Sequence, residues 1–225
     1  MYSRALLKDR AKDQLSGRRG MALAVVFTVL LIGFIPTIIS LILPEAELVS
    51  AIVSIIVNIF TIIISGGIAR FYLNFATEDS PSYGDLFSQA GLFLKILGIT
   101  ALMTLLFMLG LILLVIPGII IIYMYSMSIY VLIDDPSKGV IECLRESRYM
   151  MKGHKWQFFV LNLSFILWGL LCIVTCGIAY LWVAPYIGIT EANYYLYVSG
   201  QLSFDEPSIN MGNSETEYVD AESVE

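Results

Sequence analysis

Charged residues are scarce in this sequence: Asp, Glu, Lys and Arg make up 14% of its 225 residues. Soluble domains carry about 25% charged residues. Hydrophobic residues make up 58% of the chain, and the mean hydropathy is +0.80. A water-soluble fold of this length cannot bury so much apolar surface, so lipid must be the solvent for much of it. We therefore expect a single membrane domain.

Histidine and cysteine are also rare. The chain has one histidine, His154, and three cysteines, Cys143, Cys172 and Cys176. They form no cluster with the spacing of metal ligands and no disulfide framework. Cys172 and Cys176 stand one helical turn apart in an apolar run, which is typical of small residues that ease helix packing.

Sequence motifs of catalysis and of nucleotide binding are missing as well. There is no Walker motif, no GxGxxG with a preceding strand and no GxSxG elbow. No basic domain stands clear of the apolar runs, which argues against a nucleic-acid partner. We expect no enzyme activity, no cofactor and no metal.

What the sequence has in abundance is long apolar runs. A helix needs ~20 apolar residues to cross the hydrocarbon core of a bilayer. Six runs approach or exceed this length: 21–43, 48–72, 92–116, 119–133, 158–176 and 178–198. Pro36 and Pro185 inside them are tolerable where neighbouring helices satisfy the freed carbonyls. The runs predict an all-α, polytopic membrane protein with six transmembrane helices.

The basic residues lie on one side of this arrangement. All 13 Lys and Arg fall in the N-terminal segment, at the facing ends of the second and third runs (Arg70 and Lys95), and in the link between the fourth and fifth. The three opposite turns carry none. Because cytoplasmic loops are rich in Lys and Arg, we expect a multi-pass protein of the cell membrane with both termini in the cytoplasm.

Three parts of the chain follow from composition. Residues 1–20 form a basic amphipathic cytosolic segment, and residues 21–198 form the membrane domain. Residues 199–225 carry seven acids and no base. Such a tail has too little apolar area to fold, so we expect it to be disordered.

Each pair of spans is preceded by a segment with a helical pattern, at 2–15, 81–90 and 136–151. The second and third begin with a capping residue and proline, Ser80-Pro81 and Asp135-Pro136. We expect amphipathic helices in the cytosolic membrane interface. Their recurrence indicates three copies of an interfacial helix plus a hairpin, although turn chemistry alone would also produce the similarity.

The second half of the chain carries a set of closely spaced motifs. They are Ile116-Pro117-Gly118, Tyr123, Tyr125-Ser126-Met127, Asp134, Pro136, Ser147-Arg148, Met150 to Trp156, Leu163-Ser164-Phe165, Trp168, Thr175, Gly177-Ile178, Leu181-Trp182, Pro185-Tyr186, Thr190 and Ala192. This pattern resembles the bacterial membrane family called domain of unknown function 975, which is common in Firmicutes. The layout is more distantly similar to the membrane domain attached to some glycerophosphodiester phosphodiesterases. The resemblance implies six spans and a cell-membrane location, and it implies no functional residues because the family has no established activity.

Polar residues inside the predicted spans are candidate sites. Asn58 and Asn162 are candidates, with interhelical hydrogen bonding as the structural alternative. Glu191 is the one acid inside an apolar run, and charge there is costly. It is either a proton or cation site, or a carboxylate near the end of the sixth span that reaches headgroup water or pairs with a base.

The cluster Arg145, Arg148, Lys152 and Lys155 is a candidate for binding lipid headgroups. The alternative is that these bases serve only as the positive-inside signal. Two functions remain open on this evidence. The protein binds or transports anionic lipids or amphiphiles, or it is a non-catalytic membrane regulator whose cytosolic segments contact a membrane or cytosolic protein partner.

Overall fold

The computed structural model describes residues 4–42, 45–77, 79–113 and 115–203. Within these residues every regular element is a helix, which confirms the predicted all-α class. The elements are α1 (Arg4–Leu15), α2 (Arg19–Ile42), α3 (Glu47–Ala76), α4 (Asp85–Ser88), the 3₁₀ helix η1 (Ala90–Leu92), α5 (Phe93–Leu113), α6 (Val115–Tyr125), α7 (Ser128–Asp134), α8 (Val140–Met150), α9 (Lys155–Leu163), α10 (Ile166–Val174) and α11 (Tyr180–Val198). Most of the predicted acidic tail, residues 204–225, lies outside the described residues.

Five helical stretches in the described part are long and apolar enough to cross a membrane. They are Arg19–Ile42, Glu47–Ala76, Asp85–Ile112, Pro117–Asp134 and Lys155–Val174. These stretches correspond to the first five predicted spans. The predicted sixth span, 178–198, forms helix α11 but is not among the five, since Glu191, Asn193 and several tyrosines lower its hydropathy. The count of six spans therefore stays a prediction.

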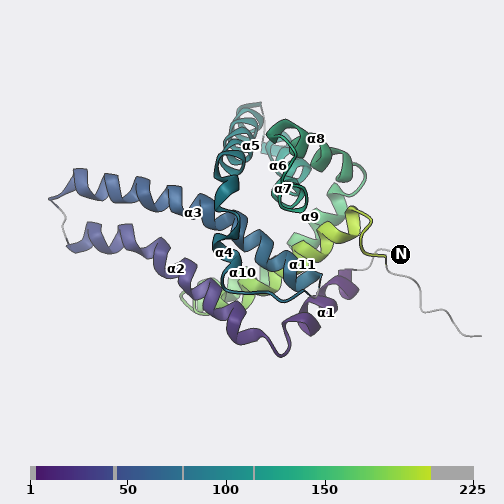
Figure 1. Cartoon of the computed structure of the whole chain (residues 1–225), viewed down its shortest axis with the longest axis horizontal. Helices are drawn as coiled ribbons and strands as arrows, with labels where there is room; N and C mark the ends of the chain where they lie inside the picture. The colour runs from purple at the N-terminus through teal and green to yellow at the C-terminus, as the bar shows by residue number, and fades with distance from the viewer. Residues whose placement is uncertain (1–3, 43–44, 78, 114, 204–225) are drawn as a thin grey trace, which may run out of the picture.

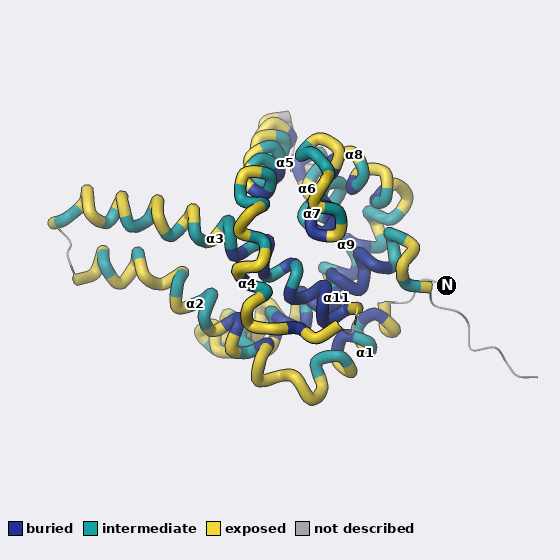
Figure 2. Tube along the Cα trace, in the orientation of Figure 1, coloured by how far each residue is buried: buried dark blue, intermediate teal, exposed yellow. Residues whose placement is uncertain are grey.

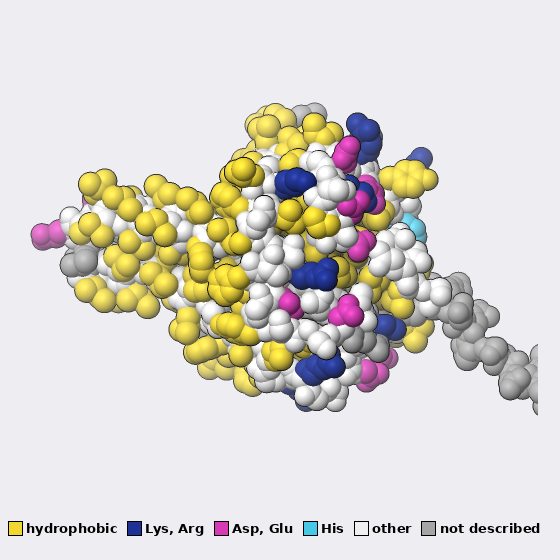
Figure 3. All heavy atoms as spheres, viewed as in Figure 1, with side chains coloured by type: hydrophobic (Ala, Val, Ile, Leu, Met, Phe, Trp, Pro, Cys, Tyr) yellow, Lys and Arg dark blue, Asp and Glu magenta, His cyan; other side chains and the backbone are white. Residues whose placement is uncertain are grey.

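Helices α2 and α3 form a hairpin whose far half projects from the rest of the molecule (Figure 1). We call residues 31–42 and 45–60 the α2–α3 arm. Its large apolar side chains face outward, and Leu41 is 82% exposed. In the space-filling view hydrophobic side chains cover the arm, whereas Lys and Arg side chains lie over the rest of the molecule (Figure 3). The arm has the surface of a segment that lipid surrounds.

Helix α11 lies in the centre of the molecule and contacts α1, α2 and α3 (Figure 1). Most of its residues from Val183 to Leu196 are buried (Figure 2). Tyr194 and Tyr195 are among the largest fully buried side chains. The hairpins are thus built around a helix that is more polar than they are.

The short helices precede the hairpins in the predicted order, but two of them begin later than predicted. Helices α4 and α8 begin at Asp85 and Val140, four residues after Pro81 and Pro136. Each proline is followed by a short non-helical segment, and an acidic side chain in the first turn of the helix bonds back to that segment. The Asp85 carboxylate accepts a hydrogen bond from the Ser82 N–H at 2.9 Å. The Glu142 carboxylate accepts one from the Gly139 N–H at 2.8 Å, which is half of a capping box.

These helices also pack on the other helices. In α1, Leu7 and Ala11 are fully buried, and α1 contacts α11 and α3. In α4, Leu86 is 1% exposed and its backbone lies directly against Gly67 of α3. A Cβ at Gly67 would come within 2.0 Å of the Leu86 carbonyl oxygen, so only glycine fits there.

The cysteine pair lies at a helix end. Helix α10 ends at Val174 with Thr175 as its C-cap, and Cys176 follows with a left-handed φ of 50°. The Gly177 N–H donates to the Cys172 carbonyl at 2.7 Å, and the Cys176 N–H donates to the Ile173 carbonyl at 3.1 Å. These two bonds form a Schellman motif. Cys176 therefore lies in the motif that ends α10. Because its side chain is exposed, it does not ease helix packing as predicted.

Candidate lipid-facing site

The predicted headgroup cluster lies on α8 and at the start of α9. Arg145, Arg148 and Lys152 are exposed, and Lys155 is partly exposed. No described side chain forms an ion pair with them. The cluster is accessible to an anionic surface, as a headgroup contact requires.

The two asparagines of the predicted spans satisfy their amides locally. Asn58 donates to the Ser54 carbonyl at 2.7 Å, and Asn162 donates to the Phe158 carbonyl at 3.1 Å. Each bond lies within one helix, to the carbonyl four residues earlier, and not between helices as the structural alternative would require. Asn58 is on the outside of the α2–α3 arm, and no described contact brings it near Asn162 or Glu191.

Glu191 lines a cavity of about 280 Å³ between α2, α3 and α11. We call this the acidic cavity. Apart from Glu191 its lining is apolar or aromatic, with Val25 and Val29 from α2 and Tyr72 from α3. Among the described residues none donates a hydrogen bond to Glu191 or pairs with it. Pairing with a base, one of the alternatives for Glu191, is not seen in the described part of the chain.

A second cavity, of about 190 Å³, combines bases with aromatic rings. We call it the basic cavity. Lys12 comes from α1 and Arg19 from the first residue of α2, and both are exposed. Trp168 of α10 and Trp182 of α11 line the same cavity. It therefore offers cations beside an apolar aromatic surface.

The aromatic side of the basic cavity continues as a cluster of rings. The Tyr186 ring lies 5.5 Å from that of Phe165 and 6.2 Å from that of Trp168, both edge-on. The Lys8 ammonium lies 4.3 Å from the centroid of Phe165, a cation–π distance. Burial lowers the pKa of Lys8, and the nearby charges of Arg4 and Lys12 lower it further. The charged form of Lys8 is thus disfavoured by its basic neighbours. An anion bound nearby would offset this repulsion.

Lys12 is only weakly neutralised within the protein. Its nearest acid is Asp9 at 3.7 Å, and both side chains are more than 60% exposed. Such an exposed pair contributes about 0–1 kcal/mol. Arg19 has no described ion pair. Both cations of the basic cavity are therefore available to a ligand.

Helix α1 is positioned against α11 by buried polar contacts. The Arg10 Nε donates to the Asn193 Oδ1 at 3.0 Å, and the Asn193 amide donates to the Gln14 Oε1 at 2.7 Å. Gln14 also donates to the Ala76 carbonyl of α3 at 3.0 Å. These bonds join α1 to α11 and α3 and so set the position of Lys12.

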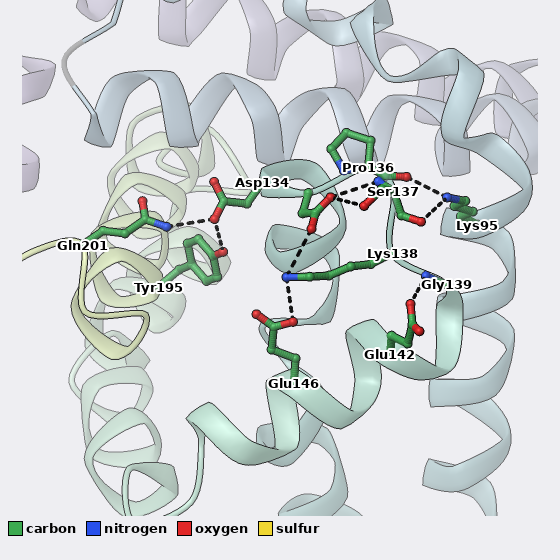
Figure 4. A network of polar contacts seen from close by, with 11 residues as sticks. Lys95, Asp134, Pro136, Ser137, Lys138, Gly139, Glu142, Glu146, Tyr195 and Gln201 are labelled. Atoms are coloured by element: carbon green, nitrogen blue, oxygen red, sulfur yellow. Dashed lines mark hydrogen bonds and ion pairs between the residues drawn. The ribbon is translucent and has the colours of Figure 1, made fainter.

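A separate polar network joins the turn before α8 to three other helices (Figure 4). The Lys138 ammonium lies 2.7 Å from Glu146 and 3.6 Å from Asp135. The Ser137 hydroxyl and N–H donate to Asp135, and they and Lys138 lower the pKa of its carboxyl. The hydrogen bond with Glu146 is the main reason that the pKa of Lys138 is raised. Lys95 of α5 donates to the Pro136 carbonyl at 2.6 Å.

Asp134, the last residue of α7 before this turn, binds the C-terminal part of α11 and the segment that follows it. Both the Tyr195 hydroxyl and the Gln201 amide donate to the Asp134 Oδ2, each at 2.8 Å (Figure 4). Asp134 and Pro136 belong to the motifs recognised in the sequence. Their described role is structural, because their atoms are occupied by protein partners. Burial raises the pKa of Cys143 on the neighbouring helix α8, so its thiol is not activated as a nucleophile.

No group of three or more His, Cys, Asp or Glu within the described residues could hold a metal ion. His154 contacts Gln157 at 2.8 Å through Nδ1, and its carbonyl accepts a hydrogen bond from the Tyr194 hydroxyl at 2.9 Å. The bond to the carbonyl joins the start of α9 to α11, and the imidazole is bonded within the first turn of α9.

Sequence reasoning missed the basic cavity. The sequence analysis counted Lys12 and Arg19 among the bases that set the orientation, and it named Trp168 and Trp182 only as motif residues of the family resemblance. The signal in the sequence was the presence of two tryptophans in the last two runs. No local pattern could show that residue 12 would face residues 168 and 182.

Comparison with known proteins gives one match. The family model described as "Protein of unknown function (DUF975)" matches residues 103–201. The match covers α6 to α11 and most of α5, and it includes the motifs from Ile116 onward. The comparison with curated proteins and the comparison with solved structures gave no match. Residues 103–201 are thus similar to the DUF975 family, as the motifs in the second half of the chain indicated.

Proposed function

We propose that the protein binds anionic phospholipids or similar anionic amphiphiles at the basic cavity. The observation that carries this proposal is that Lys12 and Arg19 stand at a cavity walled by Trp168 and Trp182. An anionic headgroup would contact the two cations, and its apolar part would lie over the indole rings. We propose further that the protein moves the same amphiphile between the two leaflets of the membrane.

The arrangement of charge supports lipid over a hydrated ion as the ligand. Residues 20–69, which include the α2–α3 arm, contain no Lys or Arg. Each base near an anionic surface contributes about 1 kcal/mol. The exposed bases Arg145, Arg148 and Lys152 add a peripheral contact in this proposal. We propose no catalytic step, and membrane lipid is the partner that the proposal requires.

The test is retention of lipid by the full chain. Native mass spectrometry of protein purified from membranes with anionic phospholipid should show bound lipid. Lys12→Gln with Arg19→Gln should reduce its retention about tenfold or more, since two contacts are removed. Arg4→Gln is the matched control, because Arg4 is an exposed base of α1 outside the cavity. Equal retention in the parent and the double variant would refute the site.

Transport is tested in liposomes with a fluorescent anionic lipid. The parent should speed exchange between leaflets, and the cavity double variant should slow it. Lys152→Glu with Lys155→Glu should reduce both retention and exchange by a smaller factor, because these bases are peripheral. A parent that neither retains anionic lipid nor speeds its exchange would favour the regulator function.

Orientation in the cell membrane is part of the proposal. Single cysteines at Ser3, Ser137 and Ser214, in a background without the native cysteines, should be shielded from impermeant thiol reagents in intact cells. A cysteine at Ala46 should react. Strong labelling from outside at Ser137 would reverse the orientation and place the basic residues on the outer surface.

A further inference from the structure

The acidic cavity is a separate site with the opposite charge. Glu191 is its one acid, and neither Lys nor Arg lines it. Among the described residues Glu191 has no hydrogen-bonding or ionic partner. An ionised carboxylate that faces apolar walls without a partner is costly, so the site favours a ligand that supplies a positive charge.

The lining of the acidic cavity follows α11. Its lining residues on that helix, Tyr180, Ala184, Ile187, Gly188 and Glu191, share one face. The first and the last lie eleven residues apart, which is about 16 Å along a helix. Glu191 stands at one end, and the rest of the groove is apolar. This length and lining fit a hydrocarbon chain better than a compact ion.

Tyr72 stands beside the acid. Its ring packs against Gly188, where a Cβ would come within 2.1 Å of a ring carbon. Gly188 is one turn before Glu191 on α11, so the phenol ring and the carboxylate lie at the same end of the groove. A ring face next to a carboxylate suits an ammonium group, through ion pairing and cation–π attraction.

We infer that the acidic cavity binds an amphiphile with a primary ammonium head. The ammonium donates to Glu191 beside Tyr72, and the chain lies in the groove along Ala184 towards Tyr180. A metal ion would need more ligands than one carboxylate, and no group of three His, Cys, Asp or Glu lies in the described part of the chain. The inference does not depend on the proposed binding of anionic lipid, since it concerns other residues and another charge.

The experiment uses photo-crosslinking of the full chain in nanodiscs of phosphatidylcholine. The probe is a twelve-carbon alkylamine with a diazirine on its chain, and the reference is the alcohol of the same length. At neutral pH the amine should label peptides of α2, α3 and α11 about tenfold more than the alcohol does. Glu191→Gln should bring the amine down to the level of the alcohol and leave labelling by the alcohol unchanged.

Two further variants keep the result interpretable. Glu47→Gln removes an exposed acid at the start of α3, distant from the groove, and should change nothing. Ala184→Phe fills the groove without touching the carboxylate and should reduce labelling by both probes. Thermal unfolding in detergent checks that each variant is folded.

Three outcomes would overturn the inference. Equal labelling by amine and alcohol would show that charge does not matter. Unchanged amine labelling in Glu191→Gln would show that the acid does not matter. Equal competition by ethylamine and by the unlabelled long-chain amine would show a site for a compact cation.

Discussion

The α2–α3 arm and helix α11 invert the usual relation between polarity and burial. The arm is apolar and exposed, with Leu41 82% exposed, whereas α11 carries Thr190 and Asn193 at 0%. In water this arrangement would be unstable. It is reasonable where lipid surrounds the arm and where buried polar groups have partners. No buried side-chain nitrogen or oxygen in the described residues lacks a hydrogen bond.

The difference shows that the two regions are stabilised in different ways. The arm satisfies its polar groups within each helix, as Asn58 and Ser54 do. Helix α11 also has hydrogen bonds to other parts of the molecule, from Asn193 to α1 and from Tyr195 to Asp134 at the end of α7. Substitutions in the arm should therefore have local effects, and substitutions around α11 should loosen several helices at once.

The largest expected effect is at Gly67. Gly67→Ala places a Cβ within 2.0 Å of the Leu86 backbone, so α4 must move away from α3. We expect a loss of about 3 kcal/mol in the free energy of unfolding. Gly33→Ala on the arm is the control, since nothing lies within 4 Å of its added Cβ. Thermal unfolding in detergent measures both, and equal losses would remove the distinction between the two regions.

The next effect compares the two asparagines. Asn193→Leu removes the hydrogen bonds that join Asn193 to Arg10 and Gln14, and we expect a loss of about 2 kcal/mol in the free energy of unfolding. Asn58→Leu on the arm should change stability by less than about 0.5 kcal/mol, because its amide bonds only to its own helix. Denaturant unfolding of the two variants provides the measurement. A larger loss for Asn58→Leu would mean that the arm packs against something polar.

A smaller effect is expected for single hydroxyl groups. Tyr195→Phe removes the hydrogen bond to Asp134 and should cost about 1 kcal/mol. Tyr83→Phe removes an exposed bond to Thr28 next to the arm and should cost less than about 0.5 kcal/mol. The same unfolding assay ranks them. If the order were reversed, the turn before α8 would be less important to the fold than its contacts indicate.

The smallest effect is the dependence on pH at the turn before α8. The pKa of Asp135 is lowered in the folded chain, so the folded state binds its proton less tightly than the unfolded chain. The stabilisation is present above about pH 4 and is lost as pH falls through the folded pKa. The stability difference between the parent and Asp135→Asn should therefore shrink towards zero in acid. A difference that persisted at low pH would point to a steric cause.

The local hydrophobic pattern of the sequence predicted most of the helices. The apolar runs predicted five helices that match stretches long enough to cross a membrane. The short helices before each hairpin were also predicted, although Pro81 and Pro136 were taken as their first residues. Asp85 and Glu142 close turns there instead, and the competition between a helix start and a turn depends on contacts such as Asn74 to Asp85.

The candidate sites were less readable. Glu191 was recognised because an acid in an apolar run is conspicuous, but its apolar surroundings come from α2 and α3. The basic cavity was not recognised at all. Its bases and its tryptophans lie about 150 residues apart in the sequence, and each has an ordinary local explanation.

The sequence by itself determined that this protein is helical and that lipid is its solvent. Both properties follow from the length and composition of single segments, which a linear pattern records. Only the tertiary structure decided that α11 is a buried hub and that a basic cavity and an acidic cavity lie beside it. Those features depend on the packing of α1, α2 and α3 against α11. Local periodicity records only neighbours along the chain, so it cannot predict contacts between segments so far apart in the sequence.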